Sequence, residues 1–234
     1  MPSEPRRLHS NTLGHPAIHA RRKRRLSRKA LGAALGLCMV VAALGTWLAT
    51  RAHTVDLGNE QQLSDSGLLQ DWAKGAVIVM IRHAERCDSA PGPCLGEPTG
   101  ITVAGSEAAV QVGQGLHHLG LANAEVLSSP KLRTRQTAHF ILGQPVATEA
   151  WLESCDNQFA KQAMAHKQPG HNLVLVTHNG CIDHFQRQQR VVGSERQSDY
   201  ASALFVSVDG TGKARILGRL SAPDWQRVLA SAGQ

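Results

Sequence analysis

The chain has 234 residues and a formal net charge of +7, long enough for one ordinary domain with extensions. The charge is uneven, because residues 1–29 hold nine Lys or Arg and one acid, and residues 30–234 carry a net charge of −1. Such a body lacks the broad basic surface that nucleic-acid binding requires. We therefore predict no nucleic-acid partner.

An uncharged run follows this basic arm. Residues 30–49 read ALGAALGLCMVVAALGTWLA, and a helix of this length spans about 30 Å, the thickness of a bilayer core. Residues 1–29 show no apolar periodicity and are predicted to be a disordered cytoplasmic arm. We favour an uncleaved inner-membrane anchor over a cleaved signal peptide, which would leave a soluble periplasmic protein, because Thr50-Arg51-Ala52 is a poor cleavage site.

Cysteine usage indicates export as well. Cys38 lies in the apolar run, and Cys87, Cys94, Cys155 and Cys181 lie beyond it. Four cysteines in an exported domain indicate two disulfides and permit three pairings. Pairing Cys87 with Cys94 is the most local choice and leaves Cys155 for Cys181.

Strands and helices alternate in the rest of the chain. Residues 50–72 are expected to be a polar linker with a short helix around 63–72, and residues 73–234 the folded domain. Expected strands are 76–81, 124–129, 144–152, 172–177, 202–208 and 213–220. Expected helices are 103–119 with Thr102 as its cap, 131–142 after Pro130, 157–167, one from 181, and a last one capped from Ser221. This order predicts an α/β three-layer sandwich with a largely parallel sheet.

Charged side chains follow two of the most apolar strands. Arg82 and His83 come directly after 76–81, and His178 and Asn179 after 172–177. In parallel sheets ligands bind where the carboxyl ends of the strands meet. Arg133, one turn into the helix at 131–142, adds a second guanidinium. Two arginines and two histidines make an anion site, because guanidinium matches phosphate oxygens and neutral imidazole can attack phosphorus.

Two other patterns in the sequence compete with this anion site. Arg135 is a rival to Arg133, but the two face about 200° apart on a helix, so only one points into a cleft. Residues Cys181 to Arg187 fit Cys-x5-Arg, the loop of cysteine-dependent phosphatases. That loop needs a glycine and a thiolate, whereas this segment holds Asp183 and an exported cysteine, so we reject it.

The combined motifs resemble a known family. Arg82-His83, then Ser128-Ser129-Pro130 with Arg133 and Gln136-Thr137-Ala138, then Thr177-His178, resemble in this order the histidine phosphatase superfamily and its phosphoglycerate-mutase-like fold, over roughly residues 75–220. The resemblance implies that His83 is the nucleophile that forms a phosphohistidine. It implies that Arg82, Arg133 and His178 bind the phosphoryl group, with no metal or other cofactor.

Two departures and one open position remain. The family's usual Arg-His-Gly is Arg82-His83-Ala84 here and its His-Gly is His178-Asn179, but neither change removes a charge. Glu153 lies near the position of the family's general acid, with Glu85, Glu149 and Asp156 as rivals. Glu85 could instead orient a histidine, bind an arginine or, like Asn179, contact substrate.

A narrower resemblance points to a substrate. The segments IRHAERCD, CLGEPTGIT and THNGC, with an anchor and paired cysteines, resemble bacterial lipopolysaccharide core heptose(II)-phosphate phosphatases. This implies a periplasmic enzyme acting on a phosphorylated sugar of a glycolipid. The alternative is a non-catalytic envelope protein of the same fold that binds phosphate or phosphorylated glycans. A mutase is disfavoured, because nothing indicates that the phosphoryl group is retained.

Overall fold

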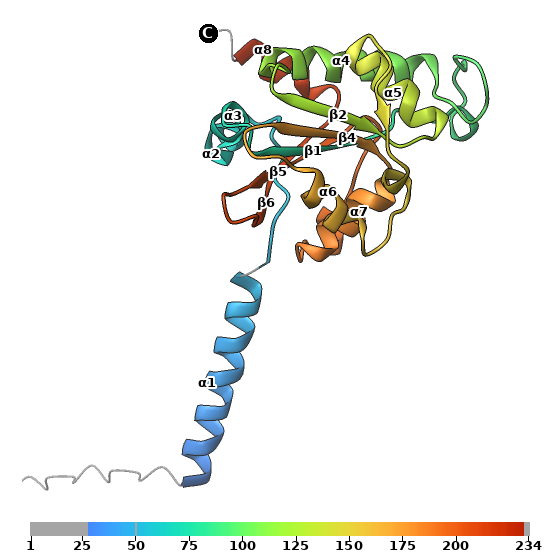
Figure 1. Cartoon of the computed structure of the whole chain (residues 1–234). Coiled ribbons are helices and arrows are strands. Elements are labelled where there is room, and N and C mark those ends of the chain that lie inside the picture. Colours follow the sequence, from blue (N-terminus) through green and yellow to red (C-terminus); the bar gives the residue numbers. More distant parts are fainter. Residues whose placement is uncertain (1–27, 50, 232–234) are drawn as a thin grey trace, which may run out of the picture. The chain divides into compact units, whose positions relative to one another are not determined.

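The computed structural model describes residues 28–49 and 51–231 (Figure 1), and the predictions for residues 1–27 lie outside them. The chain divides after Leu48 into two compact units, the first of which holds most of helix α1 (Arg28–Ala49). Seven large apolar side chains of α1 are at least half exposed: Leu35, Leu37, Met39, Val40, Val41, Leu44 and Trp47. Among the described residues, no helix meets the length and apolarity required of a membrane span.

The second unit is built on a mixed sheet. In the described part of the chain its six strands have the order β3-β2-β4-β1-β5-β6. Strands β3, β2, β4 and β1 are parallel to one another, β5 pairs antiparallel with β1, and β6 pairs antiparallel with β5. The strands are β1 Val77–Arg82, β2 Ala124–Ser128, β3 Ala147–Thr148, β4 Asn172–Thr177, β5 Ala203–Val208 and β6 Ala214–Leu220. The predicted α/β class with a mostly parallel sheet is confirmed.

Helices cover both faces of this sheet (Figure 1). One face carries α4 (Val103–Leu119), α5 (Leu132–Leu142) and α8 (Asp224–Ser231), and the other carries α6 (Phe159–His166) and α7 (Asn179–Gln188). The α4 and β4 bounds are those predicted, and the hydroxyl of Thr102 caps α4 by accepting the N–H of Gly105 at 2.9 Å. Both elements could be predicted from short stretches of sequence, α4 from its cap and β4 from its apolar run.

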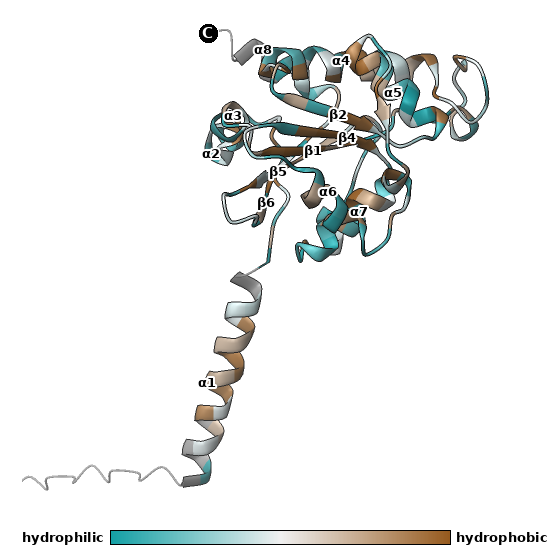
Figure 2. Cartoon of the chain, viewed as in Figure 1, coloured by the Kyte–Doolittle hydropathy of each residue, from teal (hydrophilic) through white to brown (hydrophobic). Residues whose placement is uncertain are grey.

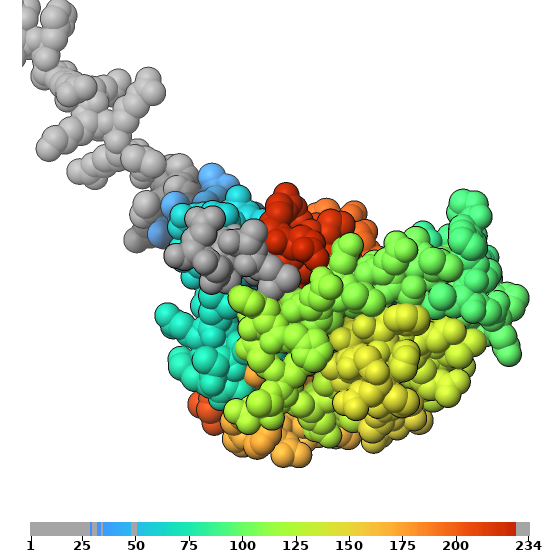
Figure 3. All heavy atoms as spheres, turned by 90° about the horizontal axis from the view of Figure 1, so that it is seen from above, coloured from blue at the N-terminus to red at the C-terminus, as the bar shows by residue number. Residues whose placement is uncertain are grey.

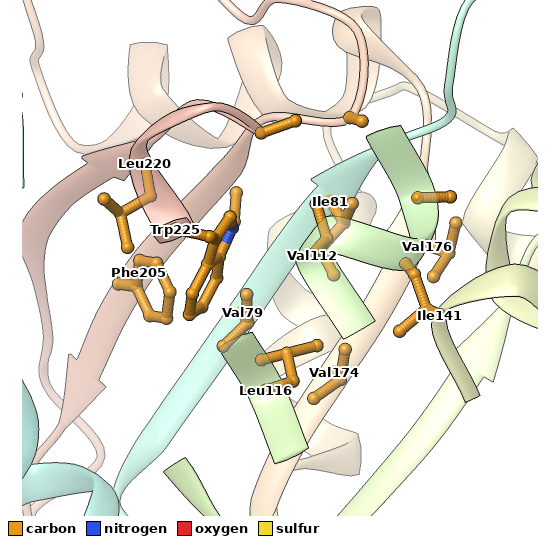
Figure 4. Packing of buried hydrophobic residues seen from close by; sticks show 14 of the residues in the cluster. Val79, Ile81, Val112, Leu116, Ile141, Val174, Val176, Phe205, Leu220 and Trp225 are labelled. Carbon is orange, nitrogen blue, oxygen red and sulfur yellow. The ribbon is translucent and has the colours of Figure 1, made fainter. Parts of the chain in front are cut away.

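The central strands are apolar throughout because both faces are covered. Figure 2 shows β1 and β4 as the brown centre of the domain. Alternate β1 side chains enter two separate cores: Val79 and Ile81 face α4 and α5, whereas Ile78 and Met80 face α6 and α7. Figure 4 shows Ile81 beside Val112 and Val79 beside Leu116, both of α4. This two-sided burial fixes the register of β1, since a shift by one residue would exchange the two faces.

The segment expected to be a linker belongs to the packed unit. It contains two short helices, α2 (Glu60–Ser66) and α3 (Leu68–Ala73). Four of its apolar side chains are buried in the core of the α4 face: Leu57, Leu63, Leu68 and Trp72. These residues are widely spaced among polar ones, so the sequence shows no apolar periodicity that would predict their burial. Because they are buried, the folded domain begins upstream of residue 73.

Helices α4 and α5 approach closely at a glycine. Figure 3 shows the face where the green, yellow and red parts of the chain, which include α4, α5 and α8, meet. A Cβ atom on Gly113 of α4 would lie 2.2 Å from the carbonyl oxygen of Ile141 in α5. Backbone atoms cannot move aside as a side chain can, so the helix pair depends on this glycine.

We predict that Gly113→Ala destabilises the fold even though alanine is the better helix former by about 1 kcal/mol. Overpacking at a backbone contact is expected to lower the free energy of unfolding by about 1–3 kcal/mol. The measurement is urea unfolding followed by tryptophan fluorescence. The control is Gly96→Ala, where a new Cβ meets nothing within 4 Å. Equal stabilities of the two variants would contradict the packing account.

Candidate functional site

The polar ends of the central strands surround one cavity of about 390 Å³. Strand pairing places Arg82 of β1 opposite Thr177 of β4, so the residues that follow them meet at one edge. The backbone N–H of His83 donates to the carbonyl of Thr177 at 2.9 Å and extends this pairing by one residue. The cavity is lined by Arg82, His83, Arg86, Lys131, Arg133, Glu153, Cys155, His178, Asn179, Gly180 and Tyr200.

His83 is a buried, neutral imidazole. Its side chain is next to the carbonyl of Ala84, with Nδ1 at 2.9 Å from that oxygen. A carbonyl oxygen only accepts, so Nδ1 carries the proton and Nε2 keeps its lone pair. Burial, with smaller contributions from Arg133 and His178, lowers the pKa of His83 to about 3. The result is a nitrogen nucleophile that stays unprotonated at neutral pH.

Arg82 is held against the cavity wall by two contacts. Its Nη1 donates to the carbonyl of Ser198 at 2.5 Å, and its guanidinium lies 3.8 Å from the ring centroid of Tyr200. The same ring lies 5.7 Å from that of His83. Burial lowers the pKa of Arg82 from its usual value, and Tyr200 and Asp199 partly offset this. These two contacts hold the guanidinium in a fixed place at the cavity, where it can bind an anion.

The Gln-Thr-Ala segment ties α5 to the nucleophile. The hydroxyl of Thr137 accepts the backbone N–H of Ala84 at 2.9 Å and donates to the carbonyl of Arg133 at 2.7 Å. Gln136 accepts the N–H of Ile101 through Oε1 at 2.9 Å. These bonds fix the first turn of α5, and with it Arg133, relative to His83. The rival Arg135 lies elsewhere, in a groove with Leu132 and Pro145.

His178 lies between Arg133 and a buried serine. Its Nδ1 is 3.2 Å from Nη2 of Arg133, and its Nε2 is 3.0 Å from Oγ of Ser129. Its ring is 5.4 Å from that of His83. Burial, followed by the charge of Arg133, lowers its pKa to about 4. His178 also begins α7, whose first residues Asn179 and Gly180 line the cavity.

Of the four carboxylates considered for the general acid, one lines the cavity and three do not. Glu153 lines the cavity and pairs with Lys131 at 3.3 Å. Glu149 and Asp156 do not line it, and Asp156 caps the N–H of Gln158. Glu85 does not line it either, because its carboxylate accepts the hydroxyl of Thr102 at 2.9 Å at the start of α4. Its expected contact with substrate is therefore replaced by a structural bond.

Both expected disulfides are present, Cys87–Cys94 and Cys155–Cys181. The second joins the chain just after Glu153 to the first turn of α7. Cys181 is thus oxidised, and Arg187 pairs with Asp183, which agrees with the rejection of a Cys-x5-Arg loop.

Besides Cys155 and Gly180, three lining residues with charged or aromatic side chains were not assigned to the site from the sequence. Arg86 pairs with Asp88 at the rim, and Lys131 pairs with Glu153. Tyr200, the single tyrosine of the chain, forms the platform under Arg82. The stretch around Tyr200 carries no motif that would predict its position. Arg86 and Lys131 could have been predicted, because each is a cation close in sequence to Arg82 or Arg133.

The two neutral histidines predict a loss of stability in acid. In the unfolded chain they titrate near pH 6.5, so between that pH and about 4 the unfolded state binds more protons and the free energy of unfolding falls as pH falls. We expect His83→Gln to remove part of this fall, of the order of 2 kcal/mol. Urea unfolding at pH 7, 5.5 and 4 measures it, with exposed His118→Gln as control. An unchanged pH slope in the His83 variant would contradict the assignment.

The chain is similar to known proteins in sequence and in fold. No family model matches the chain. Two curated relatives, the lipopolysaccharide core heptose(II)-phosphate phosphatases of Escherichia coli O139:H28 (strain E24377A / ETEC) and of Escherichia coli (strain K12 / DH10B), are each 32% identical over 136 residues. Each alignment covers 57% of this chain and 66% of the relative, so the chain spans just under two thirds of their length.

Solved structures share the fold. The protein histidine phosphatase SixA complexed with tungstate has a TM-score of 0.51 at 16% identity, over 63% of this chain and 98% of that one. The phosphoserine phosphatase of Entamoeba histolytica in complex with 3-phosphoglyceric acid has a TM-score of 0.50 at 15% identity, over 64% and 98%. Sheet order and strand-end residues define an α/β domain of the phosphoglycerate-mutase-like fold. The sequence relatives add a similarity to two phosphatases over 57% of this chain.

Proposed function

We propose that this chain is a phosphatase that hydrolyses a phosphomonoester through a phosphohistidine on His83. The observation that carries the proposal is the neutral His83, whose Nδ1–H is bound to Ala84, in a cavity shared with Arg82, Arg133 and His178. A free Nε2 lone pair supplies the nucleophile. Two half-buried guanidinium groups supply the charge that a transferred phosphoryl group needs.

The proposed reaction has two steps. In the first, Nε2 of His83 attacks phosphorus in line, the P–O bond to the alcohol breaks, and Glu153 gives its proton to the leaving oxygen. Arg82, Arg133 and His178 bind the oxygens of the phosphoryl group during transfer. In the second step Glu153 takes a proton from water, the oxygen of water attacks phosphorus, and the P–N bond breaks. His83 and protonated Glu153 are regenerated with release of phosphate.

For the substrate we propose a phosphorylated sugar of the lipopolysaccharide core. The support is the 32% identity to the heptose(II)-phosphate phosphatases of Escherichia coli. A cavity of about 390 Å³ leaves room for a sugar beside the phosphate. The cations Arg86 and Lys131 at its rim suit further anionic groups on such a glycan.

For the location we propose an inner-membrane anchor and a periplasmic domain. The uncharged run at 30–49 follows a basic cluster, and the described apolar side chains of α1 are exposed, as lipid contact requires. Two disulfides suit an oxidising compartment.

The test of the proposed function is His83→Ala. We predict that this variant loses phosphate release from an aryl phosphate by at least about 10³-fold, because the step through the phosphoenzyme is removed. In cells that lack the protein, wild type but not the variant should lower the phosphate content of the lipopolysaccharide core, measured by mass spectrometry. His118→Ala is the matched control.

Three outcomes separate the alternatives. Full activity of His83→Ala would overturn the mechanism. An unchanged core phosphate count with intact aryl phosphatase activity would remove the heptose-phosphate substrate alone. Tight binding of vanadate by a wild-type protein that releases no phosphate from any substrate would favour a binding protein.

Glu153→Gln is predicted to discriminate between leaving groups. An alkyl phosphate needs a proton on the leaving oxygen, so its kcat/KM should fall about 10²–10⁴-fold. The kcat/KM of an aryl phosphate with an acidic phenol should fall much less, because its leaving oxygen needs little help. The two kcat/KM values report phosphoryl transfer to His83 alone and leave out the shared second step, in which Glu153 acts as base. Glu149→Gln, outside the cavity, is the control. Equal losses for both substrates would exclude Glu153 as the acid.

A further inference from the structure

Ser129 lies behind the site without lining its cavity. It follows β2 and is fully buried. Its N–H donates to the carbonyl of Val176 in β4 at 3.0 Å, and its carbonyl accepts the hydroxyl of Thr134 in α5 at 2.8 Å. The sheet and α5 therefore both hold the backbone of Ser129, so its hydroxyl occupies a fixed place.

The hydrogen bonds of His178 define its tautomer. Nη2 of Arg133 lies 3.2 Å from Nδ1, and a guanidinium only donates, so Nδ1 accepts and carries no proton. The neutral imidazole must then carry its proton on Nε2, which lies 3.0 Å from Oγ of Ser129. The N–H of Lys131 also points to this oxygen, at 3.4 Å. Ser129 Oγ thus acts as an acceptor.

We propose that Ser129 is a positioning residue for the phosphatase reaction proposed above: its hydroxyl fixes His178 with Nε2–H toward the protein and Nδ1 toward Arg133 and the cavity. A phosphoryl group that draws Arg133 onto its own oxygens leaves Nδ1 free. Nδ1 then accepts a hydrogen bond from the hydroxyl of a singly protonated phosphoryl group, while Nε2–H stays on Ser129. Without the hydroxyl, a buried N–H loses its acceptor and the opposite tautomer competes.

The chain offers a matched control for this role in Ser128. It is equally buried, but its hydroxyl donates to the carbonyl of Ser129 at 3.0 Å and not to a histidine. In the full-length protein Ser129→Ala should lower kcat/KM for an aryl phosphate about tenfold, the effect of one lost hydrogen bond of ordinary strength. Ser128→Ala should lower it less than about twofold. Ser129→Thr, which keeps the hydroxyl, should recover most of the loss.

A second measurement reads the tautomer directly and needs no turnover. In full-length protein labelled with ¹⁵N-histidine, His178 is assigned by its loss in His178→Gln. We expect protonated Nε2 and unprotonated Nδ1 in wild type and Ser128→Ala, and a mixture of tautomers in Ser129→Ala.

The proposal is overturned if wild-type His178 is protonated on Nδ1, or if the two alanine variants lose activity equally. A wild type without phosphatase activity would remove the proposed function, and the tautomer would still decide whether Ser129 holds His178.

Discussion

The site depends on the parallel pairing of β1 with β4. In this register Arg82 lies opposite Thr177, and the N–H of His83 bonds to the carbonyl of Thr177. Both strands are buried on both faces. A slip of the register by one residue would therefore move the side chains of each core into the other core. Two polar segments far apart in the chain are thereby brought to one edge of the sheet. The hydrophobic core, more than any local polar contact, places the two histidines 5.4 Å apart.

The remaining parts of the site are fixed to this edge by polar bonds. Thr137 joins the backbone after His83 to Arg133, and Ser129 joins β2 to His178. The Cys155–Cys181 bond connects the chain after Glu153 to α7. Burial keeps both imidazoles neutral, and the arginines beside them oppose protonation further. A partly buried pocket rich in cations suits an anionic phosphoryl group.

Much of this arrangement could be predicted from the sequence. The prediction worked where a short stretch identifies its own element, or where the fold class brings the ends of two strands together. The apolar runs before Arg82 and before His178 predicted buried parallel strands, and their shared edge followed from the fold class. Other features depend on tertiary contacts that leave no pattern. Tyr200 meets Arg82 only in the folded chain, and Glu85, two residues after His83, turns away because its carboxylate bonds Thr102. The core residues Leu57 and Trp72 were hidden in a polar stretch.

The central claim is that His83 becomes phosphorylated, and the direct measurement is the position of the phosphoryl group in the intermediate. The protein would be mixed with an aryl phosphate, quenched within milliseconds in alkali, and digested for mass spectrometry and phosphohistidine isomer analysis. The structure predicts the phosphoryl group on Nε2 of His83, because Nδ1–H is bound to the carbonyl of Ala84. A phosphoryl group on Nδ1 of His83 or on His178, or turnover without any phosphoenzyme, would contradict the account.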